Sequence, residues 1–129
     1  MQEPKFIGRE VLDELHRESM FRFGGTMGVR DEGLIESALG AAQNTFFYAN
    51  GDYYDIAASY AFHISQAQAF LDGNKRTAVA AALVFLAVNG CGFRKDDGRL
   101  YDAMIGIAEK RVTKSQMAQL FRRIFSGAV

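Results

Sequence analysis

The sequence predicts an all-α fold, on three observations. Apolar residues recur mostly at the three- and four-residue spacing of helices. Proline, which interrupts helices, occurs once, at Pro4. The run from Lys75 to Asn89 is apolar on nearly all sides, as expected of a helix at the buried centre of a domain. A chain of 129 residues can bury such a core without disulfides, so we expect one domain spanning 1–129.

The N-terminal part predicts two helices joined by a short loop. The first covers about 8–21 and ends at Gly24-Gly25, because glycine readily takes the conformation that closes a helix. Its expected inward residues are Val11, Leu12 and Leu15. Residues 26–30 form the loop. The second helix starts near Asp31, a suitable N-cap, and places on one side Leu34, Ile35, Ala38 and Leu39.

An aromatic segment, 44–54, separates the second helix from the third. We expect it to be irregular, as a short strand pair or an exposed flap. Asp52 with Asp55 three residues later resembles an N-terminal capping arrangement. The third helix then reaches about Ala69, and one stripe of it holds Ala57, Ala61, Ile64 and Gln68.

The C-terminal half predicts three more helices. Residues 70–74 form a loop that leads into the central helix, 75–89, which Gly90 closes. Two further helices follow near 98–110 and 114–125, and Thr113 with Gln116 forms a capping box for the last one.

Composition narrows the functional classes. Lys plus Arg and Asp plus Glu each number 15, so the charge balance predicts no nonspecific binding to nucleic acid or to a membrane surface. One cysteine, Cys91, excludes an intrachain disulfide, and the two histidines lie far apart in sequence, which speaks against a Cys/His metal site. The first five residues lack the charged n-region and the apolar core expected of a signal peptide. The longest apolar run, 78–88, has about half the length of a membrane span. We expect a soluble, cytoplasmic protein.

Residues 68–76 carry the chemistry. They place a carboxylate, a glycine, an amide and two cations directly before the central helix. A helix start offers free N–H groups, and a glycine lets the backbone approach a ligand closely, so the segment predicts a phosphate site. Its expected ligands are Gly73, Asn74, Lys75 and Arg76 for phosphate and Asp72 for Mg²⁺. The alternative is an ordinary turn with an N-cap followed by two solvated cations.

This segment resembles the signature of the Fic/Doc family. Family members carry His-x-Phe-x-Asp/Glu-Gly/Ala-Asn, then Gly or Lys, then Arg, and this chain has the run Phe70-x-Asp72-Gly73-Asn74-Lys75-Arg76. The resemblance also covers 23–39 and 81–90, and in all about 6–125. It implies a compact helical bundle that binds ATP with Mg²⁺. By motif position Asp72 would be the metal ligand, Phe70 the buried anchor of the loop, and 44–54 the flap that docks the protein substrate.

Two departures favour the Doc (death-on-curing) toxin branch. Members that transfer AMP have Gly at the position of Lys75 and a second Arg at the position of Val79. Doc toxins are similar to kinases, and phosphorylate a translation elongation factor, which blocks translation. The in-chain inhibitory motif of some Fic proteins, Ser/Thr-x-x-x-Glu-Gly/Asn, has no match here, so the inhibitor is expected to be a separate antitoxin protein.

Gln68 occupies the position of the family's catalytic His. An amide does not titrate near neutral pH and cannot be a general base, a loss that typically costs about 10²–10⁴ in rate. His63 lies about 140° around the helix from Gln68 and is expected to pack at the edge of the core. His16 is expected at the surface. Neither replaces the missing base, although a glutamine can still orient an attacking hydroxyl.

Three functional hypotheses follow. The first is a Doc-like enzyme that transfers phosphate, or alternatively AMP, to a protein hydroxyl. The second is a catalytically silent Fic/Doc fold that binds nucleotide, antitoxin or target. The third is a helical interaction protein that binds no nucleotide.

Overall fold

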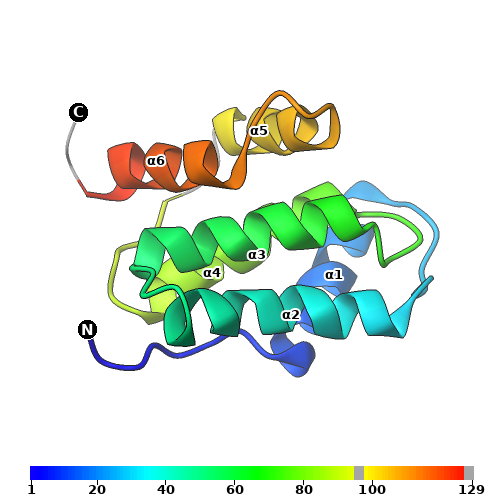
Figure 1. Ribbon diagram of the computed structural model, residues 1–129. Helices are drawn as coiled ribbons and strands as arrows, with labels where there is room; N and C mark the ends of the chain where they lie inside the picture. Colours follow the sequence, from blue (N-terminus) through cyan, green and yellow to red (C-terminus); the bar gives the residue numbers. More distant parts are fainter. Residues whose placement is uncertain (95–97, 127–129) are drawn as a thin grey trace.

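The computed structural model describes residues 1–94 and 98–126, and six helices make up their regular structure (Figure 1). They are α1 Arg9–Phe23, α2 Glu32–Phe47, α3 Tyr53–Ala67, α4 Asn74–Val88, α5 Arg99–Ala108 and α6 Lys114–Phe125. The all-α prediction is therefore confirmed. None of the described helices combines the length and the apolarity needed to cross a membrane.

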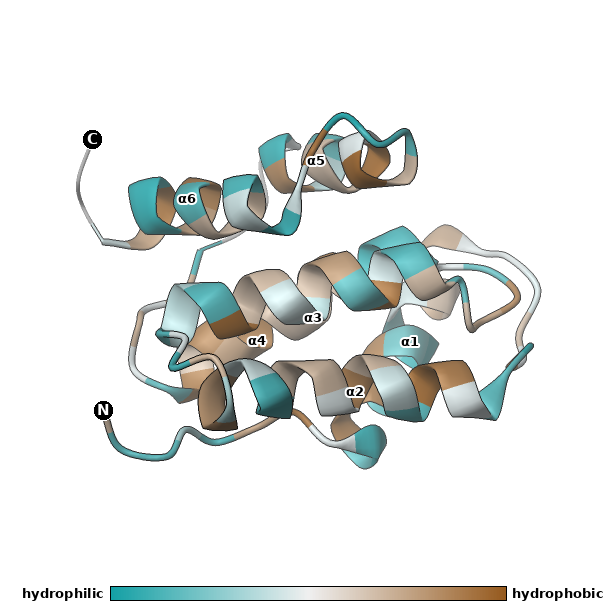
Figure 2. Ribbon diagram, in the orientation of Figure 1, coloured by the Kyte–Doolittle hydropathy of each residue, from teal (hydrophilic) through white to brown (hydrophobic). Residues whose placement is uncertain are grey.

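Helix α3 lies at the centre of the bundle and packs against α2, α4, α5 and α6. It tolerates four neighbours because its buried face is built largely from small residues, among them Ala57, Ala58 and Ala61, which let other helices approach closely. Helix α4 lies against α3, and its Phe85 and Leu86 are fully enclosed, as predicted for a buried helix. Its last residue, Val88, is however 45% exposed, and the central position predicted for this helix is held by α3. In α6 the buried residues are Met117, Ala118, Phe121 and Phe125. Hydrophilic and hydrophobic positions alternate along its ribbon (Figure 2).

The predicted caps form. Asp31 accepts a hydrogen bond from Leu34 N at 3.1 Å and starts α2. Complete capping boxes join Asp52 to Asp55 at the start of α3 and Thr113 to Gln116 at the start of α6. Each cap satisfies backbone N–H groups that the first helical turn leaves without partners, which explains why these boundaries can be predicted locally.

Two inward assignments are wrong. Val11 is 42% exposed, because the buried stripe of α1 runs through Leu12, His16, Ser19 and Met20. Leu34 is 40% exposed in the first turn of α2, while Ile35, Ala38 and Leu39 are buried as predicted.

The segment 44–54 also differs from the prediction. Its residues 44–47 continue α2, and 53–54 already belong to α3, so no strand pair forms there. The helix continues because Phe46 and Phe47 pack on Phe6, with ring centroids 6.2 and 6.0 Å apart. This segment adjoins the N-terminal end of α3, and the 68–74 loop follows the C-terminal end of the same helix (Figure 1). At 1.5 Å per residue, the 15 residues of α3 separate the two by about 20 Å. The segment therefore cannot be a flap over that loop.

Candidate functional site

The loop between α3 and α4 places the predicted phosphate-binding residues at a helix start. Helix α3 ends two residues earlier than predicted, because Gln68 takes a left-handed conformation (φ 50°, ψ 44°) and turns the chain. Ala69 and Phe70, the residue expected to anchor the loop, are then buried. Gly73 (φ 81°) leads into α4 without any side-chain cap. The backbone N–H groups of the first turn of α4 are consequently available for an anion.

Asn74 braces the loop from within. Its Oδ1 accepts from Phe70 N at 3.0 Å, and its Nδ2 donates to Phe70 O at 2.9 Å. With these two hydrogen bonds, the side chain closes the loop 70–74 as a pair of backbone hydrogen bonds between two residues would. The sequence predicts Asn74 as a phosphate ligand, but this geometry commits its acceptor and one amide hydrogen to the loop, which leaves one hydrogen for a phosphoryl oxygen.

The segment that follows α1 holds the loop from outside. Val29 forms an isolated antiparallel bridge with Phe70, and Leu71 N donates to Gly28 O at 3.0 Å. Thr26 N donates to Asp72 Oδ2 at 2.7 Å, so one oxygen of this exposed carboxylate is fixed. Among the described residues, the segment 25–30 thus borders the loop, whereas 44–54 lies at the opposite end of α3.

His16 contacts the loop from the buried face of α1, and this corrects its predicted position at the surface. It is 4% exposed, its ring is stacked on Phe70, and its Nε2 donates to the carbonyl oxygen of Asp72 at 2.9 Å. A carbonyl only accepts, so Nε2 carries the hydrogen. The available signal was the four-residue spacing from Leu12 through His16 to Met20, which places the histidine on the buried stripe of α1.

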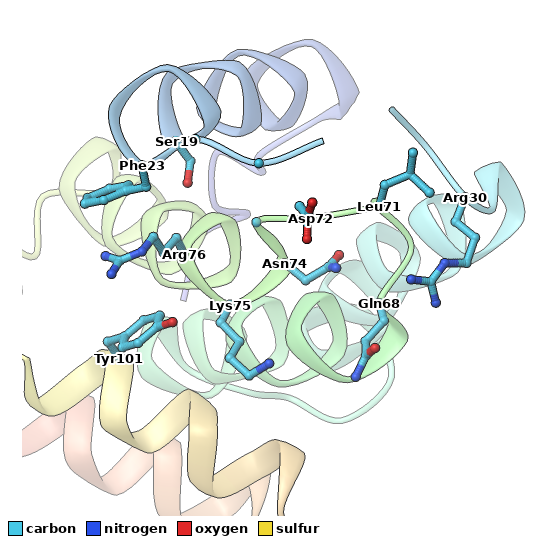
Figure 3. Close-up of a pocket in the computed structure, with 13 residues that line it drawn as sticks. Ser19, Phe23, Arg30, Gln68, Leu71, Asp72, Asn74, Lys75, Arg76 and Tyr101 are labelled. Atoms are coloured by element: carbon cyan, nitrogen blue, oxygen red, sulfur yellow. The ribbon is translucent and has the colours of Figure 1, made fainter. Parts of the chain in front are cut away.

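A cavity of about 420 Å³ opens above the loop, and the predicted site residues line it (Figure 3). Gln68, Asp72, Gly73, Asn74, Lys75 and Arg76 all do so, together with residues from α1, the 25–30 segment and α5. The described lining residues include three cations, Arg30, Lys75 and Arg76, but only one carboxylate, that of Asp72. The cavity therefore suits a polyanion.

Arg76 is held by two aromatic rings. Its guanidinium lies 3.8 Å from the ring centroid of Phe23 and 4.4 Å from that of Tyr101. Cation–π contact of this kind favours the charged group without neutralising it. The motif position identified Arg76 in the sequence. Its aromatic partners, Phe23 from α1 and Tyr101 from α5, were not predicted.

Asp72 fits the demands of Mg²⁺. Among the described residues no group of three or more His, Cys, Asp or Glu side chains is placed to hold a metal alone. Mg²⁺ does not need one, since it commonly takes one or two carboxylates together with substrate phosphates and water. One oxygen of Asp72 is held by Thr26 N, and the carboxylate borders the start of α4, where phosphates would lie.

Gln68 is exposed and borders the cavity, and neither histidine reaches it. His63 lies in a separate shallow groove with Leu34 and Ser37, and its Nε2 is 3.3 Å from Lys114 Nζ. Burial, assisted by the charge of Lys114, lowers the pKa of His63. His63 therefore packs at the edge of the core as predicted, and His16 is enclosed behind the loop.

Comparisons with known proteins show similarity to one family. A family model described as "Fic/DOC family" matches residues 6–86. The chain is 33% identical over 125 residues to "Protein kinase doc" of Escherichia phage P1, a match that covers 96% of this chain and 98% of the phage protein. It is 40% identical over 76 residues to "Toxin Doc" of Mycolicibacterium smegmatis, covering 57% of this chain and 58% of that protein.

Proposed function

The chain belongs to the Fic/Doc family, and we propose that it is a Doc-like toxin that transfers the terminal phosphate of Mg·ATP to a hydroxyl of a protein. One observation carries the proposal: the uncapped start of α4, Lys75 and Asp72 converge on one cavity. By resemblance to Doc toxins, the protein substrate is a translation elongation factor, the site of action is the cytoplasm, and an antitoxin protein restrains the toxin.

Each site residue has a defined part in the proposed transfer. The N–H groups at the start of α4 and the ammonium of Lys75 bind phosphate oxygens, and Asp72 would hold Mg²⁺, which offsets phosphate charge and orients the nucleotide. The acceptor hydroxyl oxygen forms a bond to the terminal phosphorus as the bond from that phosphorus to the bridging oxygen breaks, and ADP leaves. Because Gln68 cannot take the hydroxyl proton, the proton passes to the transferred phosphoryl group or to water, and Gln68 orients the hydroxyl.

Two positions favour phosphate transfer over AMP transfer. Lys75 adds a point charge where AMP-transferring members have glycine, and it lines the cavity. Val79 stands where those members have a second arginine, and it is 7% exposed within the core. The chain thus lacks the additional cation that AMP transfer uses in the family.

A labelling experiment tests the proposal. Purified chain is incubated with Mg²⁺, γ-labelled ATP and a bacterial lysate, beside Gln68→His, Lys75→Ala and a parallel sample with α-labelled ATP. We expect slow labelling of one protein from γ-labelled ATP, faster labelling with Gln68→His, and none with Lys75→Ala. Label from α-labelled ATP would instead indicate AMP transfer.

The second candidate is a catalytically silent fold that binds nucleotide, antitoxin or target, and Gln68 is the observation that favours it. For a silent fold that binds nucleotide, we expect calorimetry to show binding of Mg·ATP that Lys75→Ala weakens. In the labelling experiment the native chain should label no protein, while Gln68→His should label one. Absence of nucleotide binding by the native chain would exclude the enzyme and the nucleotide-binding form of the silent fold. It would leave a silent fold that binds only antitoxin or target, or a helical interaction protein.

A further inference from the structure

Arg30 lines the cavity beside Gln68, and the family motif does not include it. It lies at the end of the 25–30 segment, where its backbone N–H donates to Ala69 O at 2.7 Å. Asp31 N donates to the same oxygen at 3.1 Å. These two bonds fix the backbone of Arg30 next to the residue that follows Gln68, so its position relative to the loop does not depend on its side chain.

The guanidinium of Arg30 is available for a ligand. Its side chain is exposed, and within the described part of the chain it forms no ion pair. The acidic residues that follow it are engaged elsewhere, since Asp31 caps α2 and Glu32 pairs with Arg9. Asp72, on the cavity wall, accepts from Thr26 N. A positive charge that is not paired with a carboxylate at the edge of a cavity attracts an anionic group.

The cations of the cavity are spread along its length. Arg76 lies between Phe23 and Tyr101 at one side, Arg30 and Gln68 lie at the other, and Lys75 lies between them (Figure 3). Arg30 therefore brings a charge from the 25–30 segment to the side of the cavity that holds Gln68. By motif position Gln68 marks where the acceptor hydroxyl meets the group that is transferred.

We infer that Arg30 binds the phosphoryl group that is transferred, and this inference rests on the proposed function. Gln68 cannot accept a proton, so the site has to stabilise the transition state by charge and position. A guanidinium presents two parallel N–H donors to two oxygens of a phosphoryl group, which a lysine cannot do. Arg30 supplies this fork from within the chain.

Calorimetry with Mg·ATP and Mg·ADP tests the inference. Mg·ADP lacks the terminal phosphoryl group and keeps the other two. Arg30→Ala is expected to weaken binding of Mg·ATP roughly tenfold or more, the loss typical of a charge-assisted hydrogen bond, and to leave binding of Mg·ADP within about twofold. Arg30→Lys should fall between the native chain and Arg30→Ala. Arg123→Ala, which removes an exposed arginine of α6 that does not line the cavity, should change neither affinity.

Each outcome bears on the inference. Equal losses for both nucleotides upon Arg30→Ala would overturn it, because the contact would then not involve the terminal phosphoryl group. Unchanged affinities would also overturn it, while Mg·ATP binding by the native chain would leave the proposed function standing. No binding by the native chain would overturn both. Misfolding is checked by thermal unfolding. Arg30→Ala should leave the melting temperature unchanged, since the side chain is exposed and forms no hydrogen bond or ion pair among the described residues.

Discussion

The imidazole of His16 lies flat against the ring of Phe70, with centroids 3.9 Å apart and planes inclined by 11°. The two residues come from α1 and from the loop before α4, so the contact joins the first helix to the candidate site. The same imidazole donates to Asp72 O at 2.9 Å. One buried side chain thus fixes both the anchor of the loop and the backbone of the expected metal ligand.

Replacing His16 should separate these two contributions. His16→Ala removes the ring and the hydrogen bond, and is expected to lower the free energy of unfolding by about 2–4 kcal/mol. His16→Phe keeps a ring on Phe70 but cannot donate to Asp72 O, so it should lose less stability and still weaken Mg·ATP binding. Urea unfolding and calorimetry measure the two effects. Native affinity in His16→Phe would show that the hydrogen bond does not position the site.

Gly73 and Gly90 form a matched pair, with φ of 81° and 82°. Replacement of either by alanine should cost about 1–2 kcal/mol, because both require the left-handed region. A Cβ at Gly73 would lie 2.8 Å from Met20 Sδ and 3.5 Å from His16 Cδ2, whereas Gly90 has nothing within 4 Å. We therefore expect Gly73→Ala to weaken Mg·ATP binding and Gly90→Ala to leave it unchanged. Equal nucleotide affinities in the two variants would contradict a close fit at Gly73.

Metal removal tests the assignment of Asp72. Native affinity for ATP should fall when EDTA replaces Mg²⁺, since Asp72 and the phosphates then repel each other. Asp72→Asn keeps an oxygen that can accept from Thr26 N, so the fold should be retained. This variant should bind ATP with little dependence on Mg²⁺, and in EDTA it should bind more tightly than the native chain. Full Mg²⁺ dependence in Asp72→Asn would place the metal ligand elsewhere.

The ion cluster between α3 and α6 predicts an acid-sensitive part of the stability. Burial raises the pKa of Asp52, but hydrogen bonds from Asp55 N and from Arg122 outweigh it, so the pKa is lowered overall. A carboxyl with a lowered folded-state pKa stabilises the fold above the pKa of the unfolded chain, about 4, and loses that contribution as the pH falls through the folded-state value.

Arg122→Ala should accordingly lower the melting temperature at pH 6 and have a progressively smaller effect below about pH 4. The difference at pH 6 should be modest, about 0.5–1 kcal/mol, because the paired side chains are partly exposed. Thermal unfolding between pH 6 and pH 2 measures it, with Arg123→Ala as the control. A difference that stays constant down to pH 2 would argue against the ion pair as its cause.

Local patterns in the sequence were sufficient for most of the secondary structure. Asp31, Asp52 and Thr113 mark the starts of three helices because a cap and the amides it satisfies lie within three residues of each other. The prediction of an irregular aromatic segment over 44–54 was wrong for the opposite reason. Its helical turn is maintained by Phe6, some 40 residues away in sequence, so propensity within the segment did not reveal it.

The sequence by itself determined the chemistry of residues 68–76: which residue is acidic, which are cationic, and that position 68 holds no base. Tertiary structure alone decided what surrounds them. Three neighbours come from α1 and the segment after it, more than 35 residues earlier in the chain. They are His16, which contacts the loop, Thr26, which donates to the carboxylate of Asp72, and Arg30, which lies beside Gln68. Such neighbours depend on how α1 packs against α4, and a spacing pattern along one helix specifies its buried face but not the residues that this face will meet.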